Sequence, residues 1–220
     1  MMTRRLLQLF AGLLLYGFSM ALMVRGAIGL NPWDVFHQGV ATQVSWSFGM
    51  IVTTVGVAVL LLWIPLRQRP GIGTIANILV IGMAADLSLS LLPQVDALAL
   101  RWPMFLLGVV LNGLAGGAYI GAGLGPGPRD GLMTGIVART GWPLRTVRTS
   151  IEVAVLGTGW LMGGTLGIGT LIYAVAIGPL VHLFLPLLTV GGSDVSRGRG
   201  GAWARLRRPS GRPSAGTSPR

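Results

Sequence analysis

Long apolar runs, separated by short segments rich in Gly, Pro and Arg, dominate the chain up to about residue 190. A helix that crosses a bilayer needs about 20 mostly apolar residues. The runs therefore predict six transmembrane helices, at residues 6–25, 47–66, 72–92, 103–124, 147–165 and 169–189. The first run is too long for a signal peptide and no A-x-A cleavage site follows it, so we expect it to be retained.

Composition points to the same class of protein. Of the 220 residues, 52% are hydrophobic and only 10% are charged, whereas a soluble domain carries about 25% charged residues. This balance argues against a soluble enzyme or a soluble binding module. The absence of Cys excludes disulfides and Cys-ligated metals. No catalytic triad, metal-ligand cluster or cofactor motif is visible, so we expect no enzyme, no metal and no cofactor.

The positions of the basic residues orient the chain. All 17 are Arg, and arginines accumulate in cytoplasmic loops. A cytoplasmic N-terminus puts all of them inside except Arg25 and Arg101. The sequence therefore predicts six crossings with both termini in the cytoplasm.

Residues 191–220 differ from the rest of the chain. They are rich in Gly, Ser, Pro and Arg, and this composition predicts a disordered cytoplasmic tail. Its arginines would attract anionic lipid head groups. The tail offers only Trp203 for stacking on bases and is tethered to the bilayer, which argues against nucleic acid as a partner.

The chain is self-similar at an offset of 96 residues, without gaps. The matching positions include Gly29, Pro32, Asp34 and Gly73, which align with Gly125, Pro128, Asp130 and Gly169. We therefore predict two repeats, residues 1–96 and 97–190. Each holds three crossings, an odd number, so the second repeat would be inverted, as in many secondary transporters.

Each repeat also predicts a short helix, at 32–42 and 128–140, with Pro at its start and Asp in its first turn. Such helices are too short to span a bilayer. They are either interfacial, which the arginines at both ends of the second favour, or re-entrant and packed into the protein. In the re-entrant arrangement Asp34 and Asp130 are candidate ion or proton sites; in the interfacial one they cap helices at the surface.

Three further polar residues lie within predicted membrane helices. Asp86 and its repeat counterpart His182 are candidates for a proton or cation pathway, unless they simply reach the head groups. Asn112 would either line a cavity or form interhelical hydrogen bonds. A stripe of glycines at 113, 117 and 121 predicts close helix packing within the chain or between chains, which leaves a homo-oligomer open.

The segments around the two Pro-x-Asp motifs resemble a known family. Gly29-x-x-Pro32-Trp33-Asp34 and Gly125-x-Gly127-Pro128-Arg129-Asp130 are similar to the paired signatures of YczE-like bacterial integral membrane proteins, which are related to the YyaS/YitT-type group. The resemblance covers about residues 5–190. It implies a multi-pass protein of the bacterial inner membrane, and supplies neither catalytic residues nor a substrate.

Together these features favour a small transporter or permease for an unknown small substrate, coupled to protons or cations. The alternative is a non-transporting accessory or scaffold protein that supports another membrane system. A polar cavity in the protein interior would favour the transporter, and a dry glycine-packed interior would favour the scaffold.

Overall fold

The computed structural model describes residues 2–190, so the predicted tail and its lipid contacts lie outside the described residues. Within that range the secondary structure is helical. The helices are α1 (Met2–Gly26), α2 (Pro32–Gln43), α3 (Phe48–Leu61), α4 (Trp63–Leu66), α5 (Ile72–Leu91), α6 (Leu98–Gly121), α7 (Pro128–Thr140), α8 (Leu144–Leu161) and α9 (Ile168–Leu188).

Five segments of the described chain are long and apolar enough to cross a membrane. They are α1, the stretch from α3 through α4, α5, α6 and α9. The sixth predicted crossing corresponds to α8, which does not meet that standard because its first turns carry Arg145, Arg148 and Glu152. Length and composition thus support five of the six predicted crossings, and the sixth stays a prediction. The start of the fourth is also earlier than predicted, because Pro103 lies inside α6.

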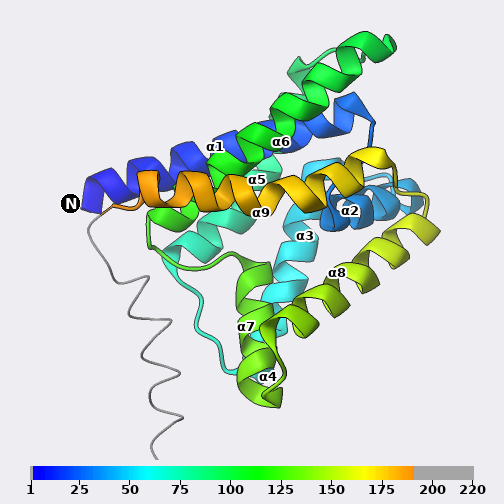
Figure 1. Ribbon diagram of the computed structural model, residues 1–220. Helices are drawn as coiled ribbons and strands as arrows, with labels where there is room; N and C mark the ends of the chain where they lie inside the picture. Colours follow the sequence, from blue (N-terminus) through cyan, green and yellow to red (C-terminus); the bar gives the residue numbers. More distant parts are fainter. Residues whose placement is uncertain (1, 191–220) are drawn as a thin grey trace, which may run out of the picture. The chain divides into compact units, whose positions relative to one another are not determined.

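The core is built on the crossing of α1 and α6, with α5 packed on α1 and α9 packed on α6 (Figure 1). Glycine allows the close approach at the crossing. A Cβ at Gly12 would lie 2.9 Å from the backbone nitrogen of Tyr119, and one at Gly108 would lie 3.0 Å from the carbonyl oxygen of Ser19. The glycine stripe at 113, 117 and 121 faces Leu180, Phe184 and Leu188 of α9, so it packs two helices of the same chain.

Two short helices, α2 and α7, fill the space beside this core. The helix α2 packs against α8, and α7 packs against α3 and α4. The turns that lead into them contain Gly29 and Gly125, whose φ values of 150° and 131° disfavour any residue with a side chain. Asn31 caps the start of α2 by accepting the backbone N–H of Asp34.

The loops before α2 and α7 are held in the same way. The Gly73 N–H at the start of α5 donates to the Leu124 carbonyl (2.9 Å), and the Gly169 N–H at the start of α9 donates to the Ile28 carbonyl (3.1 Å). Both donors and both acceptors are 96 residues apart (169 − 73 and 124 − 28). Each short helix is therefore positioned by a long helix from the other half of the sequence.

Apolar side chains also cover the outside of the long helices. On α9 the exposed large residues are Ile168, Leu171, Val175, Leu183 and Leu187. An apolar surface of this kind is expected where a protein faces lipid. The described part of the chain thus has the character of a multi-pass membrane protein.

Candidate functional site

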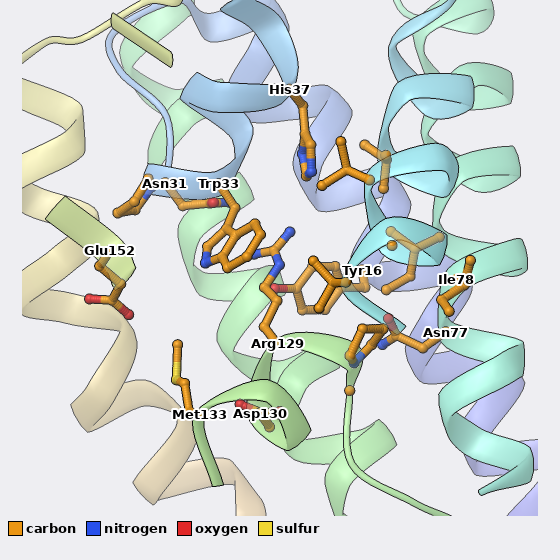
Figure 2. Close-up of a pocket in the computed structure, with 18 of the residues that line it drawn as sticks. Tyr16, Asn31, Trp33, His37, Asn77, Ile78, Arg129, Asp130, Met133 and Glu152 are labelled. Carbon is orange, nitrogen blue, oxygen red and sulfur yellow. The ribbon is translucent and has the colours of Figure 1, made fainter. Parts of the chain in front are cut away.

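A polar cavity of about 210 Å³ lies where the N-termini of α2 and α7 approach each other (Figure 2). Side chains from eight of the described helices contribute to its wall. They include Tyr16, Asn31, Trp33, His37, Asn77, Tyr119, Arg129, Asp130, Arg148, Glu152 and Tyr173. The two helix starts direct the positive ends of their dipoles toward this cavity.

Trp33 and Arg129 meet at the centre of the site. The Arg129 guanidinium lies over the Trp33 ring, 4.9 Å from its centroid. These residues occupy equivalent positions at the start of the two short helices, 96 residues apart. Figure 2 shows both side chains extending into the space between α2 and α7. A stacked guanidinium keeps its N–H edge free to donate hydrogen bonds.

Asp34 is fully enclosed beside this pair. Its backbone N–H donates to the Asn31 side-chain oxygen, and its carboxylate accepts a hydrogen bond from the Asn31 side-chain amide. His37 lies 3.2 Å from the carboxylate through Nδ1, and Arg129 lies 3.9 Å away. Burial lowers the pKa of His37, against the opposing effect of the neighbouring Asp34 carboxylate. Asp34 is thus held in a closed network and water does not reach it.

Asp130, at the equivalent place on α7, has different surroundings. Water reaches its side chain, which accepts a hydrogen bond from the Tyr119 hydroxyl (3.1 Å). Protein nevertheless surrounds the carboxyl group, and the resulting loss of hydration raises its pKa; the Tyr119 hydrogen bond and Arg129 oppose the rise. A carboxyl group that is accessible and has a raised pKa can bind and release a proton.

The charged residues of α8 line the same cavity. Arg148 and Glu152 pair at 2.9 Å, one helical turn apart, as their spacing in the sequence predicts. Their side chains are 57% and 33% exposed, so this pair borders the open part of the cavity.

Three other polar residues that the sequence predicts as site residues lie outside the cavity lining. Asp86 accepts hydrogen bonds from the Ser47 hydroxyl (2.5 Å) and the Gly49 N–H (2.6 Å), so it binds the start of α3. His182 is exposed on α9. Asn112 is fully buried. It donates a hydrogen bond to Ser19 (2.9 Å) and accepts one from Tyr173 (2.8 Å), so it forms interhelical hydrogen bonds rather than lining the cavity. Of the glycine and proline positions, Pro32 and Pro128 line the cavity.

Several cavity residues were not among the sequence candidates. Trp33 and Arg129 occupy equivalent positions but differ in type, so the repeat does not mark them, and no sequence pattern marks Tyr16, Tyr119 or Tyr173. Among residues 2–190, no group of three or more His, Asp or Glu residues comes together as a metal site would require.

Comparisons with known proteins agree with the membrane character of the fold. A family described as of unknown function, DUF6198, matches residues 3–186. An uncharacterised protein of Haemophilus influenzae is 38% identical over 180 residues, which cover 82% of each chain. The uncharacterised membrane protein YczE of Bacillus subtilis is 37% identical over 183 residues, covering 80% of this chain and 83% of YczE.

A more distant relative is YyaS of Bacillus subtilis, 24% identical over 181 residues that cover 80% of this chain and 90% of YyaS. No solved structure matches the chain. The family match spans most of the sequence, and the relatives include the YczE and YyaS proteins that the motifs at Pro32 and Pro128 suggested. The chain is a multi-pass membrane protein that belongs to the DUF6198 family.

Proposed function

We propose that the protein is a small secondary transporter whose substrate binds in the cavity between α2 and α7. One observation carries the proposal: two short helices begin face to face at a polar cavity, inside a bundle of membrane-length helices. Secondary transporters bind substrates between the ends of interrupted helices in this way. The close glycine packing that would favour a scaffold occurs between helices of the described chain, whereas this cavity is lined by polar side chains.

In this proposal the two halves are inverted repeats, and α2 and α7 are re-entrant half-helices rather than interfacial ones. Support comes from the paired hydrogen bonds of Gly73 and Gly169, which join equivalent residues of opposite halves. A second support is the contact between Trp33 and Arg129. Two equivalent residues touch each other only close to a two-fold axis, so the proposed axis passes through the cavity.

The helix α8 is proposed as the sixth crossing. Charged residues in membrane segments generally face a water-filled cavity or one another. Arg148 and Glu152 do both, because they form an ion pair and line the cavity. With α8 counted, the arginine distribution supports the orientation with both termini in the cytoplasm of a bacterial inner membrane.

A flux assay tests the proposal in a chain that contains no cysteine of its own. We would reconstitute Asn77→Cys, whose position lines the cavity, and screen proteoliposomes for uptake of small labelled anions, cations and neutral solutes. A membrane-impermeant thiol reagent should then block the flux. The control is Leu79→Cys on the same helix, where the side chain is exposed on the outside of the bundle.

The outcomes separate the transporter from the accessory protein. Flux that the reagent blocks in Asn77→Cys and leaves unchanged in Leu79→Cys supports transport through this cavity. Absence of flux for every class of solute favours the accessory or scaffold role. Flux that the reagent leaves unchanged in both variants would place the pathway elsewhere.

A further inference from the structure

We infer that the substrate is a small organic carboxylate, carried together with one proton that Asp130 holds. The inference rests on the proposed function and adds the chemistry of the substrate and of the coupling. It follows from which polar groups at the cavity already have partners and which do not.

Apart from Asp130, the polar groups of the cavity that remain available to a ligand are hydrogen-bond donors. Trp33 is only 6% exposed, and its indole Nε1–H has no hydrogen-bond partner among the described residues. A buried donor without an acceptor is costly, and an indole can only donate. Figure 2 shows the indole of Trp33 within the cavity, beside Arg129. The nitrogen is covered in this structure, so an acceptor oxygen of a ligand would satisfy it after a small shift of the side chains around the ring.

Arg129 supplies the charge for such a ligand. Its closest carboxylate contact is with Asp34 at 3.9 Å, beyond hydrogen-bond distance. The planar guanidinium is suited to a carboxylate, which it can bind through two parallel hydrogen bonds. The starts of α2 and α7 add positive dipole ends on either side.

The acidic groups other than Asp130 offer little to a cation. Asp34 is enclosed by Asn31 and His37, and Glu152 is paired with Arg148. Arg129 also occupies the face of Trp33, which a cationic ligand would otherwise use. The hydrogen-bonding groups that remain without partners therefore favour an anion as the ligand.

The size and the walls of the cavity limit the rest of the molecule. A volume of about 210 Å³ corresponds to roughly seven water molecules. The aromatic rings of Tyr16, Tyr119 and Tyr173, together with Val55 and Ile177, give the cavity apolar walls as well as polar ones. A carboxylate with a short carbon chain fits this combination better than an inorganic ion.

Asp130 supplies the coupling. Ionised, it would place a second negative charge in the cavity and repel the anion; protonated, it would not. Binding a proton forms an O–H bond on its carboxyl group, and that bond breaks when proton and anion leave on the other side. One positive and one negative charge cross together, so the step is electroneutral.

The charged and titratable groups around Asp130 are consistent with this role. With Asp130 left aside and His37 neutral, the positive charges of the two arginines equal the negative charges of the two remaining carboxylates. The groups that face the site from each element are Tyr16 on α1, Asp34 and His37 on α2, Tyr119 on α6, Arg129 on α7, Arg148 and Glu152 on α8, and Tyr173 on α9.

Binding to the purified full-length protein in nanodiscs tests the inference, with labelled pyruvate and lactate as probes and methylammonium as a cation of similar size. We expect the carboxylates to bind more tightly at mildly acidic pH than at neutral pH. Arg129→Gln should weaken binding by at least about tenfold, and Trp33→Phe, which removes the N–H, by several fold. The control is Arg139→Gln, an equal loss of charge at the far end of the same helix.

Asp130→Asn tests the proton separately. The variant should bind pyruvate at neutral pH as tightly as the wild type does at acidic pH, with a flat pH profile. The inference is overturned if methylammonium is preferred, if neither pyruvate nor lactate binds, or if Asp130→Asn keeps the wild-type profile. A different result is that the Asn77→Cys variant carries a neutral or cationic solute and the thiol reagent blocks that flux. This result would support the transporter proposal and refute an anionic substrate.

Discussion

Asp34 and Asp130 have equivalent positions in the sequence and different surroundings in the fold. Asp34 is inaccessible and held by Asn31 and His37, whereas water reaches Asp130 beside Tyr119. The chemistry of a carboxyl group follows from its neighbours, so the shared Pro-x-Asp motif does not imply a shared role. The same reasoning separates Asp86 from the cavity residues, because its neighbours are the N–H and hydroxyl groups that begin α3.

The contacts of Asp86 predict that Asp86→Asn destabilises the protein. The carboxylate accepts two hydrogen bonds at a helix N-terminus, where negative charge is favourable. We expect a loss of about 1 kcal/mol in the free energy of unfolding, seen as a lower midpoint of thermal unfolding followed by tryptophan fluorescence in detergent. Asp96→Asn, an equal change at an exposed position, should leave the midpoint unchanged.

The alternative role of Asp86, in a proton or cation pathway, gives a different pattern. In that case Asp86→Asn would abolish coupled flux in proteoliposomes while the unfolding midpoint stayed at the wild-type value. Normal flux together with a lowered midpoint would assign Asp86 to the helix start alone.

At the scale of elements, the packing of long helices depends on glycines at equivalent places. Gly12 of α1 approaches Ala115 and Tyr119 of α6, and Gly108 of α6 approaches Ser19 and Met23 of α1. Both glycines lie 96 residues apart, and so do their neighbours. The crossing therefore contains two equivalent contacts. In one the glycine belongs to α1, and in the other it belongs to α6.

This contact predicts that Gly12→Ala and Gly108→Ala are both destabilising. The added methyl group would lie 2.9 Å from the Tyr119 nitrogen in the first and 2.8 Å from the Met23 side chain in the second. Each substitution should cost about 1–3 kcal/mol, and Gly12→Ala should cost more because backbone yields less than a methionine side chain.

The matched control is Gly178→Ala, where nothing lies within 4 Å. It should leave the unfolding midpoint unchanged or raise it, since alanine favours a helix. Equal effects at Gly178 and Gly12 in the same unfolding assay would contradict the packing role.

Much of this architecture could be predicted from apolar runs and from the 96-residue offset. The runs predict α1, α3, α5, α6 and α9 because each depends on composition over many residues. The cavity could not be predicted, because Trp33 and Arg129 come together only when the two halves fold against each other. Identity at aligned positions also directs attention to Asp34 and Asp130, while the central pair consists of residues that differ.

At the scale of the whole molecule, the number of crossings depends on α8. The first turns of α8 are charged, so this helix is less apolar than the other long helices, which are apolar enough to cross a membrane. If α8 crosses the membrane, the segments on either side of it lie on opposite faces. If it does not, they lie on the same face, and the proposed inversion of the second half fails.

Cysteine labelling of intact cells can decide this, again using the absence of native cysteine. We expect Asp96→Cys and Leu166→Cys to react with an impermeant reagent added from outside, and Arg69→Cys and Arg145→Cys to react only after the cells are permeabilised. Leu166 is chosen because its side chain is exposed, whereas Gly164 is in close contact with Val35. External labelling of Arg145→Cys would refute the inverted arrangement.

The stacking of Arg129 on Trp33 has a consequence for the origin of the chain. If the two halves descend from one ancestral gene, that gene encoded a single residue at this position, and two copies assembled in opposite orientations would have placed it against itself. Two arginines in contact would repel each other, and two tryptophans would supply no charge. Only after the gene was duplicated could each position mutate alone, so an aromatic ring opposite a guanidinium is an arrangement that a homodimer of identical halves could not have built.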